Sequence, residues 1–276
     1  MKVRILTAIG MAIFGIPLLI FSDMLIYPIA VSALALIAMF EMLGVTGFRR
    51  NPAVFIPAYA AVAAFPLLSY FFAENLKELA VAALLTTMGL LLYYFGYAVT
   101  RKGRVKFSSL ATHITTLFYL AASFSSISLV RYIPNGVYYF GMVFLASWTS
   151  DVFAYFCGRA FGKHKLIPEV SPKKTVEGAI GGVIFTTLAF LLYGFIITML
   201  EGTPNPNYIV LALLGFVLSI VSMFGDLIAS LIKREHGIKD YGKIFPGHGG
   251  VLDRFDSILA VAPILLALCI FFPPFS

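Results

Sequence analysis

Four aspartates stand in or beside apolar stretches of this 276-residue chain that are long enough to cross a membrane. Asp226 lies inside the run 218–232, Asp151 lies near the end of another run, and Asp253 and Asp256 open the last one. An aspartate at membrane depth costs about 2.5–3.5 kcal/mol on insertion scales, so each one needs a compensating interaction. The four carboxylates are candidates for a site, although an ion pair between helices would also account for Asp226.

The spacing of these residues indicates shared helix faces. Asp226, Ser230 and Lys233 recur at i, i+4 and i+7, which is one face of a helix. Asp253 and Asp256 are i, i+3 neighbours, and such like charges repel unless a cation or a basic side chain lies between them. Carboxylate oxygens without a histidine–cysteine cluster suit a hard cation such as Mg²⁺. Alternatively, Asp253 is an acid that favours a helix start.

Two basic segments have the composition of phosphate sites. Lys233-Arg-Glu-His-Gly-Ile-Lys-Asp240 leads into Phe245-Pro-Gly-His-Gly-Gly250, where glycines let backbone N–H groups approach a ligand closely. His248 suits a phosphate donor or a proton carrier. In the second segment, Ser171 is predicted to cap a helix that begins at Pro172, which would place free N–H groups beside Lys173 and Lys174. Topology determination or contact with anionic lipid is the alternative function for such basic loops.

The composition excludes a soluble, disordered or fibrous protein. Hydrophobic residues make up 60% of the chain and charged residues 12%, against about 45–50% and about 25% in an ordinary soluble domain. The formal charge of +7 therefore indicates charged cytosolic loops and no nucleic-acid partner. The two cysteines match neither a metal spacing nor a disulfide framework.

The apolar residues fall into nine segments, so we expect an all-α polytopic membrane bundle with about nine transmembrane helices. Because no cleavage site follows the first segment, it is expected to be retained, and the first two form either a hairpin or a broken re-entrant element. The segments run 4–22, 24–41, 53–72, 78–99, 109–130, 136–156, 176–200, 207–232 and 255–273.

The placement of lysine and arginine predicts the orientation. With the N-terminus in the cytosol and the C-terminus outside, 18 of the 20 basic residues lie inside, and only Lys77 and Arg131 lie outside. We expect divergent transmembrane helices over 1–135. The catalytic helices are expected over 136–276, with two cytosolic loops at 157–175 and 233–254.

The segment from Ser230 to Asp256 resembles the signature of bacterial phosphatidate cytidylyltransferases (CDP-diacylglycerol synthases), and every position that this signature specifies is met. Ser171-Pro-Lys-Lys-Thr-Val-Glu-Gly178 and the run from Asp151 to Gly158 also resemble motifs of that family. The resemblance covers the C-terminal half of the chain. It implies an integral enzyme of phospholipid biosynthesis that joins CTP and phosphatidic acid, with Mg²⁺, to give CDP-diacylglycerol and pyrophosphate.

Roles for individual residues follow from this resemblance as hypotheses. Asp226, Asp253 and Asp256 would hold Mg²⁺, with room for a second cation and with Asp151 as a lesser ligand. Basic side chains would neutralise phosphate charge, namely Lys233, Arg234, Lys239 and Arg254. The remaining substrate-binding candidates are Ser171, Lys173, Lys174, Glu177, Ser230, Asp240, Gly247, His248, Gly249 and Gly250.

Two other functions stay open at this point. A CTP-dependent lipid kinase of the polyprenol type would share much of the site, and a cation-coupled transporter would also carry intramembrane acids. Transporters more often place such acids near the midplane within inverted repeats, and none is evident here. The expected location is the bacterial inner membrane with the site facing the cytosol. Gly178 and Gly182 would permit close helix packing, including a homodimer.

Overall fold

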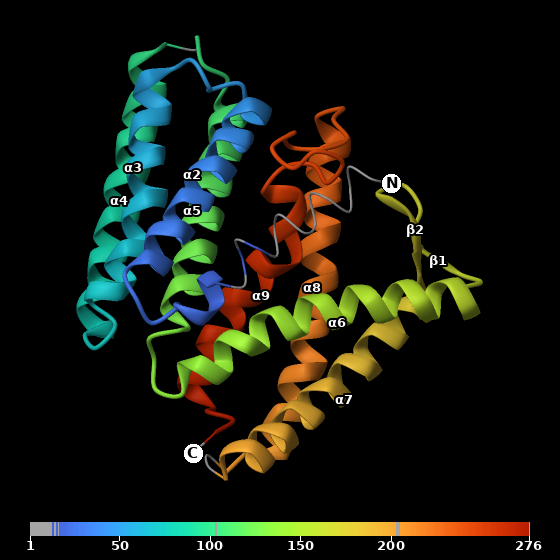
Figure 1. Cartoon of the computed structure of the whole chain (residues 1–276). Helices are drawn as coiled ribbons and strands as arrows, with labels where there is room; N and C mark the ends of the chain where they lie inside the picture. Colours follow the sequence, from blue (N-terminus) through green and yellow to red (C-terminus); the bar gives the residue numbers. More distant parts are fainter. Residues whose placement is uncertain (1–12, 14, 16, 103, 203–204, 276) are drawn as a thin grey trace. The chain divides into compact units, whose positions relative to one another are not determined.

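The computed structural model describes residues 13, 15, 17–102, 104–202 and 205–275, and these residues are mostly helical (Figure 1). The chain divides into two compact units, which are described separately. The first unit comprises Met1–Ile133 and Asp240–Arg254, and the second comprises Pro134–Lys239 and Phe255–Ser276. The segment 240–254 therefore belongs with the N-terminal helices, although it lies far from them in the sequence.

Eight helices within the described residues are long and apolar enough to cross a membrane. This confirms a polytopic helical membrane protein. The first of the nine predicted spans, 4–22, lies largely outside the described residues, so the count of nine stays a prediction. The eight helices are α2 (Ile26–Thr46), α3 (Pro52–Phe71), α4 (Leu76–Thr100), α5 (Phe107–Leu129), α6 (Gly136–Phe161), α7 (Val176–Glu201), α8 (Tyr208–Glu235) and α9 (Leu252–Phe271).

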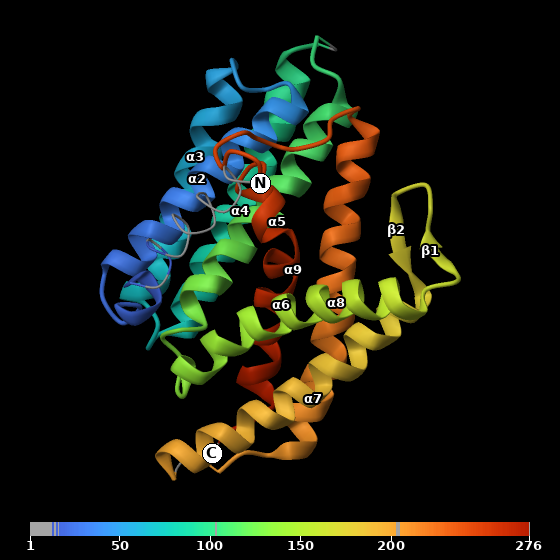
Figure 2. The same cartoon turned by 45° about the vertical axis from the view of Figure 1, so that its right-hand side comes forward.

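One hairpin is an exception to the all-α prediction. Strands β1 (Lys165–Ile167) and β2 (Ser171–Thr175) pair antiparallel, with Lys165 opposite Thr175 and Ile167 opposite Ser171. Pro172 is tolerated because each strand of a two-stranded ribbon is an edge strand, where a missing N–H group need not break a ladder. Figures 1 and 2 both show the hairpin beyond the junction of α6 and α7.

Helices α2, α3 and α5 form the packed centre of the first unit and are joined by buried hydroxyl groups. Ser32 Oγ of α2 donates to the carbonyl oxygen of Ala63 in α3, and Ser128 Oγ of α5 donates to that of Pro66, each at 2.9 Å. Hydrogen bonds of this kind join transmembrane helices where the hydrophobic effect gives no preference for helix over lipid.

Pro57 inside α3 explains a contact with α4. A proline has no N–H group, so Pro57 cannot donate to the carbonyl of Ala53 one turn earlier. The hydroxyl of Tyr93 in α4 donates to that carbonyl instead, at 2.8 Å. The freed backbone group is thus satisfied by a neighbouring helix, as the membrane interior requires.

Glycines let the helices of the second unit approach closely. A Cβ at Gly178 of α7 would lie 2.5 Å from the carbonyl oxygen of Ala154 in α6, and a Cβ at Gly182 would lie 3.1 Å from that of Ser150. The close helix packing predicted at Gly178 and Gly182 (the small-residue stripe) is therefore confirmed. The stripe packs against α6 of the same chain.

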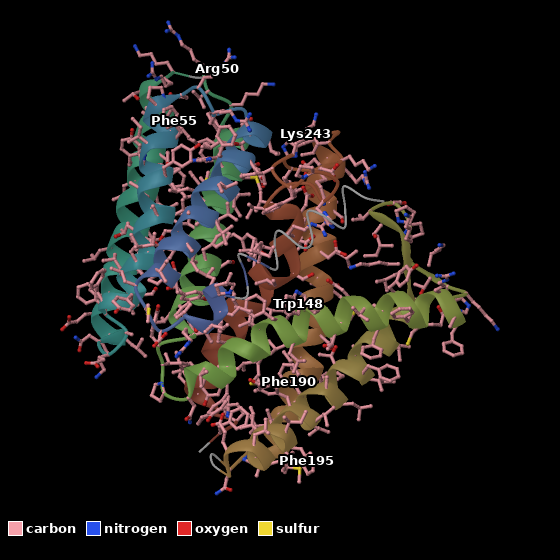
Figure 3. All side chains as sticks on the ribbon, viewed as in Figure 1. Arg50, Phe55, Trp148, Phe190, Phe195 and Lys243 are labelled. Atoms are coloured by element: carbon pink, nitrogen blue, oxygen red, sulfur yellow. The ribbon has the colours of Figure 1, made fainter. Side chains whose placement is uncertain are left out.

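Large apolar side chains cover much of the helix surface, as expected for lipid contact. Trp148 is 58% exposed and Phe195 is 49% exposed, whereas Phe190 of the same helix as Phe195 is buried (Figure 3). In water, such surface would be an aggregation hazard; in a bilayer it is the surface that lipid tails cover.

Candidate functional site

Asp226 and Asp256 are brought together in the second unit by a close approach of α8 and α9. A Cβ at Gly225 would lie 2.7 Å from the carbonyl oxygen of Asp256 and 2.8 Å from the Ala260 side chain, so only glycine fits there. Asp226, Asp151 and Lys233 all lie near enough to Asp256 to interact with it electrostatically. Three of the four predicted acids thus share one region of this unit.

Lys174 supplies the positive charge beside Asp226. Its Nζ lies 2.7 Å from Asp226 Oδ2, and the two side chains are 21% and 29% exposed. Ser230, one turn further along α8, donates to Asp226 Oδ1 at 3.4 Å, as its i, i+4 spacing predicts. Strand β2 therefore carries a lysine to the acid of α8, and both side chains are partly exposed.

The N-terminus of α7 does not begin where the sequence predicts. Ser171 does not cap it and Pro172 is not its first residue, because residues 171–175 are strand β2. Thr175 is the N-cap, and its hydroxyl accepts from the N–H group of Gly178 at 3.2 Å. Ser171-Pro172 suits either a helix start or an edge strand, and pairing with residues 165–167 decides between them.

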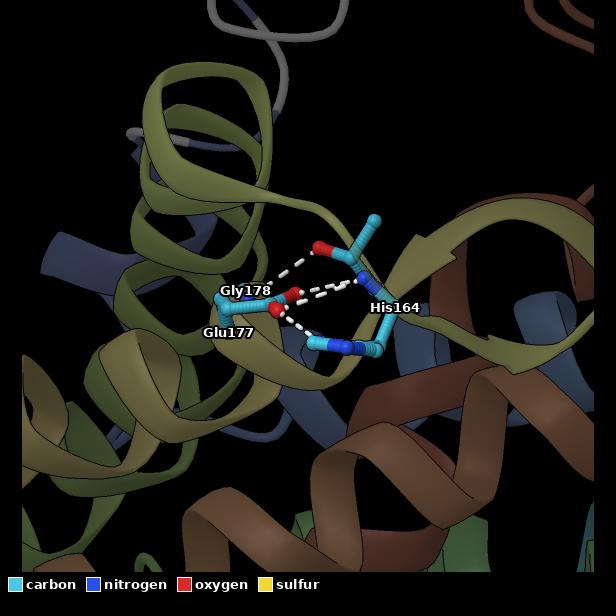
Figure 4. Close-up of polar contacts among 4 residues, drawn as sticks. His164, Glu177 and Gly178 are labelled. Carbon is cyan, nitrogen blue, oxygen red and sulfur yellow. Dashed lines mark hydrogen bonds and ion pairs between the residues drawn. The ribbon is translucent and has the colours of Figure 1, made fainter.

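Glu177 holds the hairpin to the first turn of α7. Its carboxylate accepts the backbone N–H of His164 at 3.2 Å, and its Oε1 lies 2.6 Å from His164 Nδ1 (Figure 4). His164 has no role in the sequence interpretation, and its contact with Glu177 was missed. In this structure Glu177 positions the hairpin; its predicted part in substrate binding stays a prediction.

In the first unit, Asp253 organises the glycine-rich segment. Its Oδ2 accepts the N–H groups of Tyr241 at 2.8 Å and Gly250 at 2.9 Å, and its side chain is 7% exposed. A Cβ at Gly249 would lie 2.7 Å from that oxygen. Asp253 is thus more than an acid at a helix start, and its predicted role as a metal ligand stays a prediction.

The loop around His248 is a tight turn that requires glycine. Phe245 N–H donates to Gly249 O at 2.9 Å, and His248 N–H donates to Phe245 O at 2.8 Å. Gly247 and Gly249 have φ of 77° and 88°, which side chains with a Cβ rarely adopt. The sequence analysis gives these glycines a role in close approach to a ligand, which stays a prediction; in the structure the backbone conformation of the turn itself requires them.

Glu41 contacts the start of α9, and the sequence analysis did not predict this contact. Glu41 is only 4% exposed, and its carboxylate accepts the N–H groups of Val251 and Leu252 at 3.0 Å each. The available signal was its position: Glu41 is an acid at the end of an apolar run, where an unpaired charge is costly.

The predicted basic residues lie at the ends of helices and in connecting segments. Lys233 and Arg234 occupy the last turn of α8, Arg254 lies in the first turns of α9, and Lys239 and Asp240 follow α8. Lys233 is half-buried, whereas the other four and Lys173 are exposed. The exposed lysines and arginines are accessible to an anionic ligand.

The donor set of the second unit fits a hard cation. Asp226, Asp256 and Asp151 offer carboxylate oxygens, which Mg²⁺ prefers. No group of three or more acids, histidines or cysteines in the described part of the chain is placed so that it could hold a metal ion by itself.

Comparison with known proteins gives the family. Residues 2–272 match the model of the cytidylyltransferase family. A protein of Staphylococcus haemolyticus named phosphatidate cytidylyltransferase is 35% identical over 98% of this chain and 99% of its own length. Proteins of the same name from Staphylococcus epidermidis and Staphylococcus aureus are each 34% identical over the same shares. The likeness includes the N-terminal half, and the chain belongs to the cytidylyltransferase family.

Proposed function

We propose that this chain is a phosphatidate cytidylyltransferase. The phosphate of phosphatidic acid attacks the α-phosphorus of CTP, the bond from that phosphorus to the bridging oxygen of the β-phosphate breaks, and CDP-diacylglycerol and pyrophosphate leave. The main structural observation behind the proposal is the position of Asp226. It is an acid within a membrane-spanning helix, it is paired with Lys174, and it lies near Asp256. The name of the similar proteins supports the choice of substrates.

The chemistry of the substrates explains why charge gathers inside a membrane helix. A diacyl lipid keeps its tails in the bilayer, so its phosphate reaches an enzyme near the membrane surface, while CTP arrives from water. Transfer between two anions needs their charges neutralised and their reacting atoms aligned. Lys174 lies beside Asp226, and basic residues in the last turn of α8 and just after it would attract the triphosphate, namely Lys233, Arg234 and Lys239.

Mg²⁺ is the proposed cofactor, with Asp226 and Asp256 as its ligands in the second unit and Asp151 as a lesser one. The carboxylate donor set supports this choice. Bound Mg²⁺ would neutralise charge on the triphosphate and on the pyrophosphate leaving group. Metal binding by Asp253 and the presence of a second cation stay predictions. The assay with EDTA and with Asp253→Asn, described below, addresses the metal dependence and the role of Asp253.

Further binding roles belong to the proposal. The turn from Gly247 to Gly250, with His248, would contact phosphate, and Arg254 would add charge. Ser171 and Lys173 of strand β2 would contact substrate from the hairpin. The site would face the cytosol of a bacterial inner membrane, which the predominance of basic residues in the predicted cytosolic segments supports.

A homodimer through transmembrane helices is also part of the proposal. The Gly178 and Gly182 stripe cannot form it, because α6 of the same chain packs there. The exposure of α4 supports another surface, since Tyr94 is the only buried residue among those of this helix. Light scattering of the purified protein in detergent would give the mass of one chain or of two.

The test is product identification with purified protein in liposomes that contain phosphatidic acid, supplied with CTP and Mg²⁺. CDP-diacylglycerol and pyrophosphate should form in equal amounts, and both should be lost with EDTA and with Asp253→Asn. A lipid phosphate with CDP, formed from a lipid alcohol, would instead indicate the kinase. Cation uptake without either product would indicate a transporter.

A further inference from the structure

Glu41 joins two parts of the first unit that are 210 residues apart in the sequence. Its Oε1 accepts the N–H group of Val251 and its Oε2 accepts that of Leu252, each at 3.0 Å. Leu252 is the first residue of α9 and Val251 precedes it, so both N–H groups belong to a helix start that has no partner within its own helix. A residue of α2 thus caps α9.

The glycines of the loop are shaped around the same carboxylate. The three atoms that a Cβ at Gly250 would meet first all belong to Glu41, and the distances are too short for any real contact. A Cβ at Gly242 would also collide with Glu41 Oε1. Gly250 has no positive φ, so the position of Glu41, and not the backbone conformation, explains why glycine stands there.

Three successive amides are fixed by two carboxylates. Gly250 N–H donates to Asp253, and the next two, of Val251 and Leu252, donate to Glu41. Asp253 also accepts Tyr241 N–H and so closes the segment onto itself. Asp253 alone would fold the loop locally; Glu41 attaches it to the N-terminal helices.

We propose that Glu41 is a positioning residue for cytidylyl transfer. It holds the glycine-rich segment and the start of α9 in one arrangement, so that the phosphate-binding turn and Asp253 are aligned before substrate arrives. This inference rests on the proposed function for its kinetic part. Its structural part, the attachment of residues 241–252 to α2, can be measured without any substrate. Alignment of this kind lowers the barrier by avoiding reorganisation during the reaction.

Glu41→Gln is the first variant, because the amide keeps the size of the side chain but turns one acceptor into a donor. That donor would face a backbone N–H group, so one of the two hydrogen bonds is lost. We expect hydrogen–deuterium exchange of the peptide 241–252 to become at least tenfold faster. We expect kcat to fall at least tenfold, while the KM for phosphatidic acid changes less than threefold.

Ser32→Ala is the matched control. Ser32 also lies in α2 and is buried, and its hydroxyl donates to Ala63 of α3 and not to the segment 240–254. It should lower thermal stability slightly and leave both the exchange of 241–252 and the kinetics at wild-type values. Equal changes in the two variants would mean that Glu41 acts only on general stability, and this would overturn the proposal.

A double variant tests whether Gly250 and Glu41 act through one contact. Gly250→Ala should reduce turnover because its methyl group meets the carboxylate. If the collision is the cause, Gly250→Ala combined with Glu41→Ala should be no less active than Glu41→Ala alone. Multiplied losses in the double variant would contradict the shared contact.

The outcomes separate this inference from the proposed function. If wild-type protein makes no CDP-lipid, the function is wrong, but faster exchange in Glu41→Gln would still establish the attachment. A folded Glu41→Gln with unchanged exchange and turnover overturns the inference. If that variant does not fold, Glu41→Asp replaces it: its shorter side chain should free one amide, so faster exchange supports the proposal and unchanged exchange refutes it.

Discussion

At the scale of single residues, the carboxylate of Asp226 combines charge with partial exposure. Lys174 and Ser230 contact its two oxygens, and Asp256 lies near enough to interact with it electrostatically. A pair that served only to join helices would gain little from exposure, because water weakens the attraction. A pair that must exchange partners with a metal or a phosphate needs that access.

Asp226→Asn tests this assignment. The amide keeps the volume and one acceptor but removes the charge, which leaves Lys174 without its counter-ion. We expect turnover of CTP to fall on the order of 100-fold or more, the loss typical when one electrostatic group of a site is removed. The measurement is CDP-lipid formation at saturating substrate. Ser222→Ala, a buried change one turn earlier on α8, should keep wild-type turnover; equal losses in both variants would contradict the assignment.

Metal binding by the same acid can be measured without turnover. A ligand that binds only the folded protein raises its stability, by about 2.7 kcal/mol at 100 times its Kd. Mg²⁺ should therefore raise the Tm of the wild-type protein in detergent, and EDTA should reverse the shift. Asp226→Asn should show a much smaller shift. The same shift in both proteins would mean that Mg²⁺ binds elsewhere.

At the scale of elements, the sequence predicts helices well and their contacts poorly. The apolar runs place every described helix within a few residues, and the spacing of Ser230 from Asp226 predicts their hydrogen bond. Ser171-Pro172 was misread because its residues suit a strand as well as a cap, and the choice depends on pairing with residues 165–167. Glu41 was missed because its partners lie 210 residues away, where no local pattern reaches.

The packing of α7 on α6 gives a prediction at this scale. Gly178→Ala would place a methyl group 2.5 Å from the backbone carbonyl of Ala154, which cannot move without the helix. Overpacking of this kind typically costs about 1–3 kcal/mol, so the Tm should fall by several degrees. The control is Gly96→Ala on α4, where the added carbon would meet nothing within 4 Å apart from the adjacent backbone of its own helix.

The control should match the wild type or exceed it slightly in Tm, because alanine is favoured over glycine inside a helix. A Gly178→Ala protein as stable as Gly96→Ala would mean that α6 and α7 are less closely packed than described. Thermal unfolding monitored by intrinsic fluorescence or by light scattering measures both variants under the same conditions.

At the scale of the whole molecule, whether the two ends of the chain lie on the same side of the membrane depends on whether the number of membrane-crossing helices is even or odd. The eight described helices return the chain to the side on which α2 begins, so the segment before α2 and the C-terminus share one side if all eight cross. With the C-terminus outside, the N-terminus reaches the cytosol only if the segment 4–22 also crosses. The basic residues then lie almost wholly inside, which is the distribution that membrane proteins favour.

Cysteine labelling tests this topology. In a Cys157→Ser, Cys269→Ser background, Lys77→Cys in the first turn of α4 would report the membrane side on which α4 begins, and Lys243→Cys would report the segment after α8. Both lysines are exposed, so a thiol at either place can react. A membrane-impermeant maleimide should label Lys77→Cys on intact cells and Lys243→Cys only after permeabilisation. The reverse pattern would place the glycine-rich segment outside, away from CTP, and would refute the cytosolic site together with the predicted orientation.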